Sequence, residues 1–268
     1  MAGPDRTTSV LKLFTLDRPA WTVEQAAAAL GVSASSAYRY VAVLTEAGLL
    51  TPAGGGAYVL GPAFTQYDRQ IQLTDPLLQA ARPAMEGILP LAPPGSAVLL
   101  CRLFGETVLC IHQEVGQEVG PSFGRLGAPV SYERGRPMPL FRGATSKVIL
   151  AWLPPRELRR LFEAHRGEIA ASGLGEDWPA FRTALARTRR AGHQVSHAEL
   201  DAGRIGIAVP VLGTVLGETR RVLGSLSYVI PEDAADAVPR LAPALAAAAR
   251  GIEAVLDSPA TAEPAIPA

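Results

Sequence analysis

Six side chains that carry hydroxyl or guanidinium groups occur close together near the N-terminus of the chain. They are Ser33, Ser35, Ser36, Tyr38, Arg39 and Tyr40. Such groups form hydrogen bonds with phosphate oxygens and with the edges of nucleic-acid bases. Ala37, Val41 and Leu44 run between them at the spacing of one buried helix face. The segment therefore predicts a helix that packs on one side and presents candidate DNA contacts on the other.

The residues before this helix predict a helix-turn-helix. Residues 7–16 show near-helical spacing of apolar side chains, and Thr22 can cap a short alanine-rich helix that ends at Gly31. Ser33 then caps the next helix about two residues later. A tight turn that contains glycine, between a short helix and a longer one, is typical of this motif, whose second helix enters the major groove of double-stranded DNA.

A glycine-tipped hairpin follows the helix pair. Leu49 and Leu50 open an extended stretch, the glycines at 54–56 suit a hairpin tip, and residues 58–60 suit the returning strand. Alanine-rich helix pairs also occur in ordinary helical domains, so the pair alone would leave both interpretations open. The ordered set of helices, glycine turn and hairpin is more specific, and it predicts a winged helix-turn-helix over residues 1–65.

Net charge does not support or exclude this prediction. The chain contains 25 Lys plus Arg and 25 Asp plus Glu, so its composition lacks the excess of basic residues that nucleic-acid binding often shows. The expected wing carries no Lys or Arg near its tip. We therefore expect this element to add little to the salt dependence of DNA binding.

The length and composition predict two globular domains. The chain has 268 residues, of which 48% are hydrophobic and 19% charged, and single cores usually saturate at about 100 to 200 residues. The uncharged apolar stretches fall short of the roughly 20 residues that span a bilayer, and the N-terminus does not resemble a signal peptide. We expect a cytoplasmic protein without a membrane partner.

The sequence after residue 65 predicts an α+β domain with a mostly antiparallel central sheet. A linker helix is expected at 62–74 and the domain at 75–257, before a disordered tail at 258–268. Strands are expected at 97–104, 107–112, 193–200, 204–213 and 221–230. One helix is expected to begin near residues 143–146, and others lie at about 155–164, 179–191 and 232–256. The first two strands are apolar on both faces, as in strands covered on each side.

The helix that begins near Gly143 is the best candidate for a ligand site in this module. A helix N-terminus presents backbone N–H groups to an anion, and Arg142 lies directly before it. Arg125, Arg134 and Arg136 precede it in a polar, glycine-rich loop. Either this loop is simply solvated, or one of the arginines points inward and favours an anionic ligand.

Two cysteines are expected to face each other. A two-residue turn at Gly105 and Glu106 places Cys101 opposite Cys110 on neighbouring strands. In a reducing compartment we interpret them as small buried residues rather than as a disulfide or a redox switch.

An enzyme whose N-terminal helices only dimerise is the alternative interpretation. Common nucleophile, nucleotide and zinc motifs do not occur in the sequence, so no catalytic residue, metal ligand or cofactor is assigned. His193 and His197 share a strand face without a third ligand nearby and are interpreted as ordinary histidines. Glu199 and Asp201 fall in an expected turn, where a structural or gating role is favoured over acid–base chemistry.

The chain resembles the IclR family of bacterial transcriptional regulators in three stretches. These are LGVSASSAYRYVAVLTEAGLL, PMPLFRGATSKVILAWLP and RRAGHQVSHAELDAGRIGIAVPVLG. The resemblance extends from about residue 7 to residue 256. It departs from the family pattern at Ser146, which precedes Lys147 where glycine is common.

The resemblance implies a winged helix-turn-helix followed by a GAF-like effector domain. It also implies a homodimer or homotetramer on a pseudo-palindromic operator, acting as repressor or activator under the control of a small-molecule effector, such as a small organic or aromatic acid. Carried onto matching positions, the effector contacts are Met138, Leu140, Ala144, Thr145, Ser196, Arg204, Gly206, Ser227 and Val229.

Overall fold

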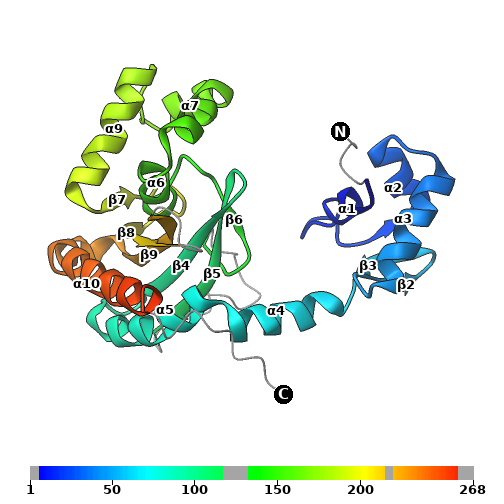
Figure 1. Cartoon of the computed structure of the whole chain (residues 1–268), viewed down its shortest axis with the longest axis horizontal. Helices are drawn as coiled ribbons and strands as arrows, with labels where there is room; N and C mark the ends of the chain where they lie inside the picture. The colour runs from blue at the N-terminus through cyan, green and yellow to red at the C-terminus, as the bar shows by residue number, and fades with distance from the viewer. Residues whose placement is uncertain (1–5, 117–131, 215–219, 259–268) are drawn as a thin grey trace. The chain divides into compact units, whose positions relative to one another are not determined.

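A computed structural model describes residues 6–116, 132–214 and 220–258. The chain divides into two compact units, Met1–Thr74 and Asp75–Ala268, and each is described by itself (Figure 1). The expected tail, except for Ser258, and most of the polar loop with Arg125 lie outside the described residues.

Three helices and a small sheet make up most of the first unit. Helices α1 (Arg6–Leu11), α2 (Val23–Leu30) and α3 (Ala34–Glu46) accompany strands β1 (Trp21–Thr22), β2 (Leu50–Gly54) and β3 (Ala57–Leu60), in the order β1-β3-β2. Val10, Val41, Leu44 and Leu50 form the buried core. The helix expected at 7–16 ends at Leu11, because the next residues form single turns and the Leu13 carbonyl accepts a hydrogen bond from the Trp21 indole.

Local capping fixes the turn between α2 and α3. Thr22 and Gln25 form a reciprocal capping box at the start of α2. Gly31 ends that helix with φ at 63°, a left-handed conformation that glycine adopts without strain. Ser33 then caps α3. The winged helix-turn-helix pattern is thus confirmed, and α4 (Ala63–Thr74) follows it.

The second unit is built on an antiparallel sheet, as expected, and the short strand β6, which was not predicted, makes it six-stranded. Its strands follow the order β6-β5-β4-β9-β8-β7. They are β4 (Ala97–Phe104), β5 (Thr107–Val115), β6 (Pro137–Met138), β7 (Gln194–His197), β8 (Arg204–Gly213) and β9 (Arg221–Pro231). Cys101 pairs with Cys110 across β4 and β5, in agreement with the expected two-residue turn, and both thiols are free and buried.

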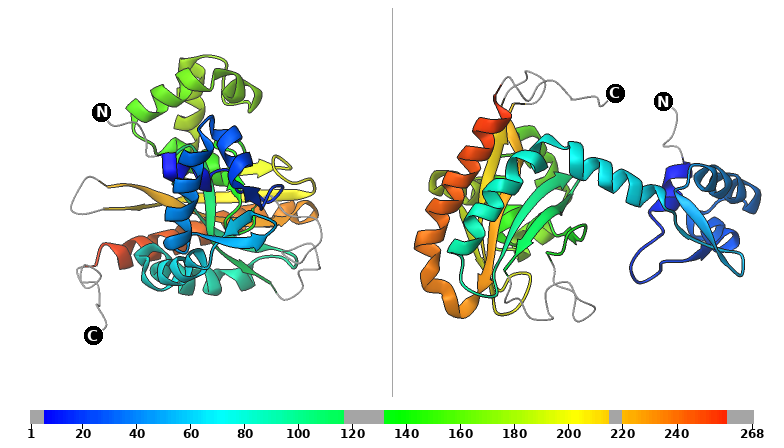
Figure 2. Two further views of the ribbon diagram at one scale, coloured as in Figure 1. Left: turned by 90° about the vertical axis from the view of Figure 1, so that its right-hand side faces the viewer. Right: turned by 90° about the horizontal axis from the view of Figure 1, so that it is seen from below.

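Helices cover both faces of this sheet. Figure 2 shows α5 (Pro76–Ile88) and α10 (Val238–Leu256) along one face. On the other face α6 (Ala144–Ala151) packs against the sheet, and α7 (Pro155–Ala164), α8 (Arg166–Ala171) and α9 (Trp178–Ala191) add apolar side chains to the same core. Val98 and Leu100 belong to the first core, and Leu99 and Cys101 to the second. This alternation explains why β4 is apolar on both faces.

Several elements of the second unit differ from the sequence expectation. The last helix is divided into η2 (Glu232–Ala237) and α10, with non-helical backbone angles at Ala234. A short 3-10 helix, η1 (Leu89–Leu91), and helix α8 were not expected. The strand expected at 193–200 stops at His197, because Ala198 turns the backbone with a positive φ of 48°. Within the described residues, no helix combines the length and apolar character needed to span a bilayer.

Candidate functional site

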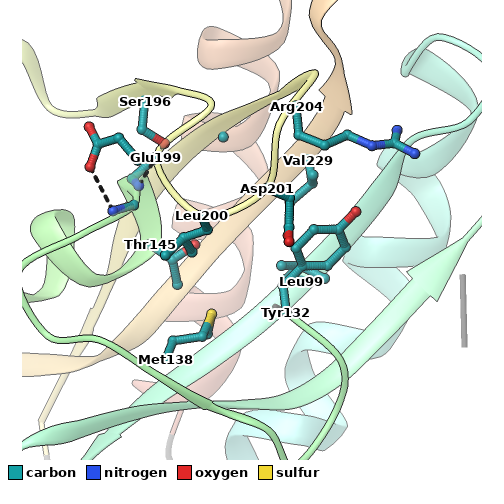
Figure 3. A pocket seen from close by; sticks show the side chains of 13 residues that line it. Leu99, Tyr132, Met138, Thr145, Ser196, Glu199, Leu200, Asp201, Arg204 and Val229 are labelled. Carbon is teal, nitrogen blue, oxygen red and sulfur yellow. Dashed lines mark hydrogen bonds between the residues drawn. The ribbon is translucent and has the colours of Figure 1, made fainter. Parts of the chain in front are cut away.

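A pocket of about 360 Å³, counted with its open mouth, lies where the start of α6 meets the sheet and the β7–β8 loop (Figure 3). Most of the effector contacts implied by the resemblance line it: Met138, Ala144, Thr145, Ser196, Arg204, Gly206 and Val229. These residues come from β6, α6, β7, β8 and β9, so the fold brings distant segments to one place.

Leu140 and Ser227 do not belong to the lining. Leu140 is buried in the core on the α6 side of the sheet. The Ser227 hydroxyl is fully buried and lies 3.0 Å from the Thr145 hydroxyl. Ser227 therefore holds a lining residue from behind instead of facing the pocket.

The sequence interpretation missed part of the wall. The additional lining residues are Leu99, Tyr132, Gly143, Glu199, Leu200 and Asp201. Alternation along β4 places Leu99 on this face, but no sequence signal selects it over its neighbours. Glu199 and Asp201 were noticed only as turn residues, because the sequence does not show that this turn closes over a cavity.

The backbone N–H groups at the start of α6 are not all free for a ligand, contrary to the sequence expectation. The Gly143 N–H donates to Glu199 Oε2 at 2.9 Å, and the Ala144 N–H donates to Ser196 Oγ at 3.0 Å (Figure 3). The expectation was wrong at these two donors because the β7–β8 segment supplies oxygen acceptors that the sequence alone does not place there.

Gly206 allows this close packing. A Cβ atom at this position would stand 2.9 Å from Ser196 Oγ and 3.3 Å from Ala144 Cβ. Only glycine leaves enough room for the start of α6 to approach strands β7 and β8.

Lys147 links α6 to the same loop. Its Nζ lies 2.8 Å from both carboxylate oxygens of Glu199 and donates to the Ser172 carbonyl at 3.4 Å. The Lys147 side chain is 8% exposed and that of Glu199 27%. A charged, largely buried lysine of this kind depends on its carboxylate partner.

The arginines near the pocket donate to backbone carbonyls. Arg204 donates to Gly95 at 2.7 Å, Arg134 donates to Ile111 at 3.1 Å, and Arg142 donates to Glu199. Figure 3 shows the Arg204 guanidinium extending away from Thr145 and Ser196. Arg204 thus contributes to the pocket wall while its guanidinium anchors the segment before β4.

Tyr132 gives the pocket a neutral phenol. Burial raises the pKa of the Tyr132 hydroxyl to about 12, although the positive charge of Arg204 opposes this shift. The side chain lies in the wall together with Asp201. At neutral pH this phenol is protonated and able to donate a hydrogen bond.

Helix α3 presents a polar outer face. Ser35, Tyr38 and Arg39 are exposed, with Tyr38 at 65%. Ser33 accepts a hydrogen bond from the Ser36 N–H at 3.2 Å, and the two hydroxyls lie 3.0 Å apart. Tyr40 packs partly against the core, and the Arg39 guanidinium lies 5.8 Å from its ring centroid. Ser35, Tyr38 and Arg39 are therefore the exposed residues of this set that take no part in the Ser33 cap or in the core.

The hairpin behind α3 has the expected glycine tip. Gly54, Gly55 and Gly56 all have positive φ, a conformation that residues with a Cβ atom rarely adopt.

Over the described ranges, no cluster of three His, Cys, Asp or Glu side chains could hold a metal ion. His193 lies before β7, and its Nδ1 lies 3.0 Å from the Ala191 carbonyl oxygen.

A winged helix-turn-helix joined to a pocket-containing α+β domain defines a class of ligand-responsive DNA-binding regulators. The family model for the bacterial transcriptional regulator IclR C-terminal domain matches residues 75–254, and that for the IclR helix-turn-helix domain matches residues 3–54. These matches cover most of the chain, which belongs to the IclR family of transcriptional regulators.

Individual relatives agree with this assignment. The HTH-type transcriptional regulator KipR of Bacillus subtilis (strain 168) is 26% identical over 212 residues, which cover 77% of this chain and 78% of KipR. An IclR transcriptional regulator of a Silicibacter species has a similar fold, with a TM-score of 0.72, 24% identity and coverage of 94% and 96% of the two chains.

A third relative was solved with a small molecule. It is an IclR homolog of Microbacterium hydrocarbonoxydans in complex with 4-hydroxybenzoate, with a TM-score of 0.69, 25% identity and coverage of 94% of this chain and 97% of that chain. The chain is thus a DNA-binding transcriptional regulator by family, and these comparisons give no support to the enzyme alternative.

Proposed function

We propose that this regulator senses a small organic or aromatic acid in the pocket beside α6, and that occupancy changes its affinity for operator DNA. The pocket itself carries this proposal, because it combines an apolar wall with polar groups at one end. Leu99, Met138 and Val229 supply the wall, and Thr145 and Ser196 supply hydroxyls. Such a division of polarity suits a small ring or chain with a polar substituent.

The relative solved with 4-hydroxybenzoate supports this class of ligand. A carboxylated aromatic would place its ring against the apolar wall and its carboxylate toward the start of α6. The helix macrodipole favours negative charge at that end. Met138, Ala144, Thr145, Ser196, Gly206 and Val229 are the proposed contacts, with Arg204 in the wall and Leu140 and Ser227 supporting from behind.

For the DNA-binding step, we propose that Ser35, Tyr38 and Arg39 contact the bases or phosphates, while Ser33, Ser36 and Tyr40 fix the position of α3. Two copies of the chain would present two recognition helices, and each would enter one half-site. Half-sites about 34 Å apart in a pseudo-palindrome match this arrangement. The proposed division of the chain is a DNA-binding domain at 1–65, a linker helix at 62–74 and an effector domain at 75–257.

For signal transfer, the effector has to bind one arrangement of its domain more tightly than another. Only such a difference in affinity shifts the equilibrium, and coupling between sites typically amounts to about 1 to 3 kcal/mol. Helix α4 leads directly into Asp75, the N-cap of α5. We propose that this connection passes the change to the spacing of the two recognition helices.

The test is to measure binding of the full-length protein to labelled DNA from its own promoter region by fluorescence anisotropy. Organic acids found by thermal shift would then be added, because a bound ligand raises the apparent stability. The expected result is DNA binding that requires residues 1–65 and changes with the acid. DNA binding that persists without residues 1–65 would contradict the first half of the proposal, and binding that no acid changes would contradict the second.

A further inference from the structure

A carboxylate of the chain itself occupies the positive end of the pocket. Glu199 accepts a hydrogen bond from the Gly143 N–H at 2.9 Å, and both of its oxygens lie 2.8 Å from Lys147 Nζ. Gly143 is the N-cap of α6, where the helix favours negative charge. An incoming anion therefore finds these positive groups already paired.

Lys147 makes this pairing hard to break without a replacement. Its side chain is 8% exposed, and its other hydrogen bond goes to a backbone carbonyl at 3.4 Å. Loss of the carboxylate would leave a largely buried ammonium without an anionic partner, which is strongly unfavourable. Departure of Glu199 is thus linked to the arrival of another anion.

Glu199 is better placed to move than Lys147. Its side chain is 27% exposed, and it lies on a loop, whereas Lys147 lies within a fully buried helix. Ala198, directly before it, is the one non-glycine residue with positive φ in the described part of the chain. Leu200 and Asp201 on the same loop also line the pocket, so any movement of Glu199 reshapes the pocket wall.

We propose that Glu199 is an internal competitor that the effector's carboxylate displaces from Gly143 and Lys147, releasing the loop at residues 198–203. This inference rests on the proposed function, since it requires that the pocket binds an effector. Displacement also provides selectivity. A monoanion replaces the negative charge of Glu199 beside Lys147, whereas a neutral molecule of the same shape does not.

Calorimetric titration of the full-length protein with benzoate and with its neutral analogue benzamide tests the displacement. Glu199→Gln keeps the side-chain shape but removes the competing charge. We expect this variant to bind benzoate about tenfold more tightly than the wild type, while its affinity for benzamide changes little. Asp201→Asn removes a carboxylate of the same wall that does not pair with Lys147. This variant should give a clearly smaller gain in affinity for benzoate.

Binding of benzoate to Glu199→Gln that is equal to or weaker than binding to the wild type would overturn the inference. If the wild type still binds benzoate, only the displacement fails and the proposed function stands. If no chain binds either probe, this inference fails, whereas the proposed function fails only if the thermal-shift screen also finds no organic acid that binds. If Asp201→Asn gains as much affinity for benzoate as Glu199→Gln, the gain reflects only the lower negative charge near the pocket. This result would also overturn the displacement.

Two further measurements do not depend on the folding of the single variant Glu199→Gln. Hydrogen exchange of the wild type should become faster at residues 198–201 when benzoate is added, and slower or unchanged exchange would contradict release of the loop. The double variant Lys147→Met/Glu199→Gln removes both charges together. It should bind benzoate and benzamide with similar affinities, and a retained preference for benzoate would overturn the role assigned to Lys147.

Discussion

The hydroxyl oxygens of Thr145 and Ser227 lie 3.0 Å apart in the buried interior, where they join the first turn of α6 to strand β9. This contact fixes a residue of the pocket wall from the side that faces away from the cavity. The position of the wall thus depends on a polar pair of which only one member, Thr145, lines the pocket.

Removal of one hydroxyl of this pair should cost more than removal of both. Ser227→Ala leaves the Thr145 hydroxyl without its partner, and we expect a loss of about 1 to 3 kcal/mol in the free energy of unfolding. The double variant Thr145→Val/Ser227→Ala should recover part of this loss. A double-mutant cycle measured by urea denaturation checks both values, and strictly additive effects would show that the pair does not interact.

A methyl group at Gly206 should destabilise the protein. In Gly206→Ala the new Cβ stands 2.9 Å from Ser196 Oγ, so we expect a loss of about 1 to 3 kcal/mol from overpacking. Gly251→Ala is the matched control, because this glycine lies within α10 with open space around its Cβ position. The control should gain about 0.5 to 1 kcal/mol. Thermal unfolding of both variants would reveal opposite signs, and two losses of similar size would contradict the steric argument.

The exposed arginine of α3 should matter for DNA affinity. Arg39→Ala removes a guanidinium from the outer face of the helix without changing the core, and we expect about a tenfold or larger loss of affinity for operator DNA. Arg69→Ala on α4 removes the same charge from another exposed site of the first unit. Anisotropy titrations at a fixed salt concentration should separate the two, and equal losses would indicate a general charge effect.

The stability contributed by His165 should depend on pH. His165 Nε2 lies 2.8 Å from Glu106 Oε2, and this hydrogen bond raises the pKa of His165 above 6.5 and lowers that of Glu106 below 4.5. The histidine contribution is complete below pH 6.5 and disappears as the pH rises through its raised folded-state pKa. The glutamate contribution is present above pH 4.5 and is lost as the pH falls through its lowered folded-state pKa.

The pair should therefore stabilise the fold most between those two values. The difference in Tm between the wild type and His165→Gln should be largest near pH 5.5, roughly the middle of that window, and should shrink as the pH rises through the raised pKa of His165. The effect will be small because both groups lie near the surface. A difference in Tm that stays constant between these pH values would assign the role of His165 to its contact with the Phe141 ring instead.

The sequence predicted the architecture better than the pocket. Local signals such as the Ser33 cap, the glycine at residue 31 and the two-residue turn at Gly105 and Glu106 depend on neighbouring residues, and the structure agrees with them. The apolar residues on both faces of β4 likewise predicted a sheet covered on both sides. These features are set within a few residues of the chain, so a single sequence contains them.

The contacts that shape the pocket join residues far apart in the chain. The expected free N–H groups of α6 are engaged by Ser196 and Glu199, which lie more than fifty residues away in sequence. Alternation along β9 places Ser227 and Val229 on the same face, but only the structure shows that Val229 lines the cavity whereas Ser227 contacts Thr145 and does not belong to the lining. Such relationships depend on how strands and helices meet in space, which local pattern does not determine.

Helix α4 carries an apolar stripe that should hold two copies of the chain together. Phe64, Tyr67 and Ile71 are exposed at spacings of three and four residues, which matches the seam of a two-stranded coiled coil. We expect Ile71→Glu to weaken the dimer by placing a charge in this seam and to lower the affinity for a palindromic operator, because the two half-sites would no longer be bound together. Gln66→Glu adds the same charge to the opposite side of the helix and should leave the dimer intact. Sedimentation velocity of both variants checks the oligomeric state, and a dimer that survives Ile71→Glu would place the interface elsewhere.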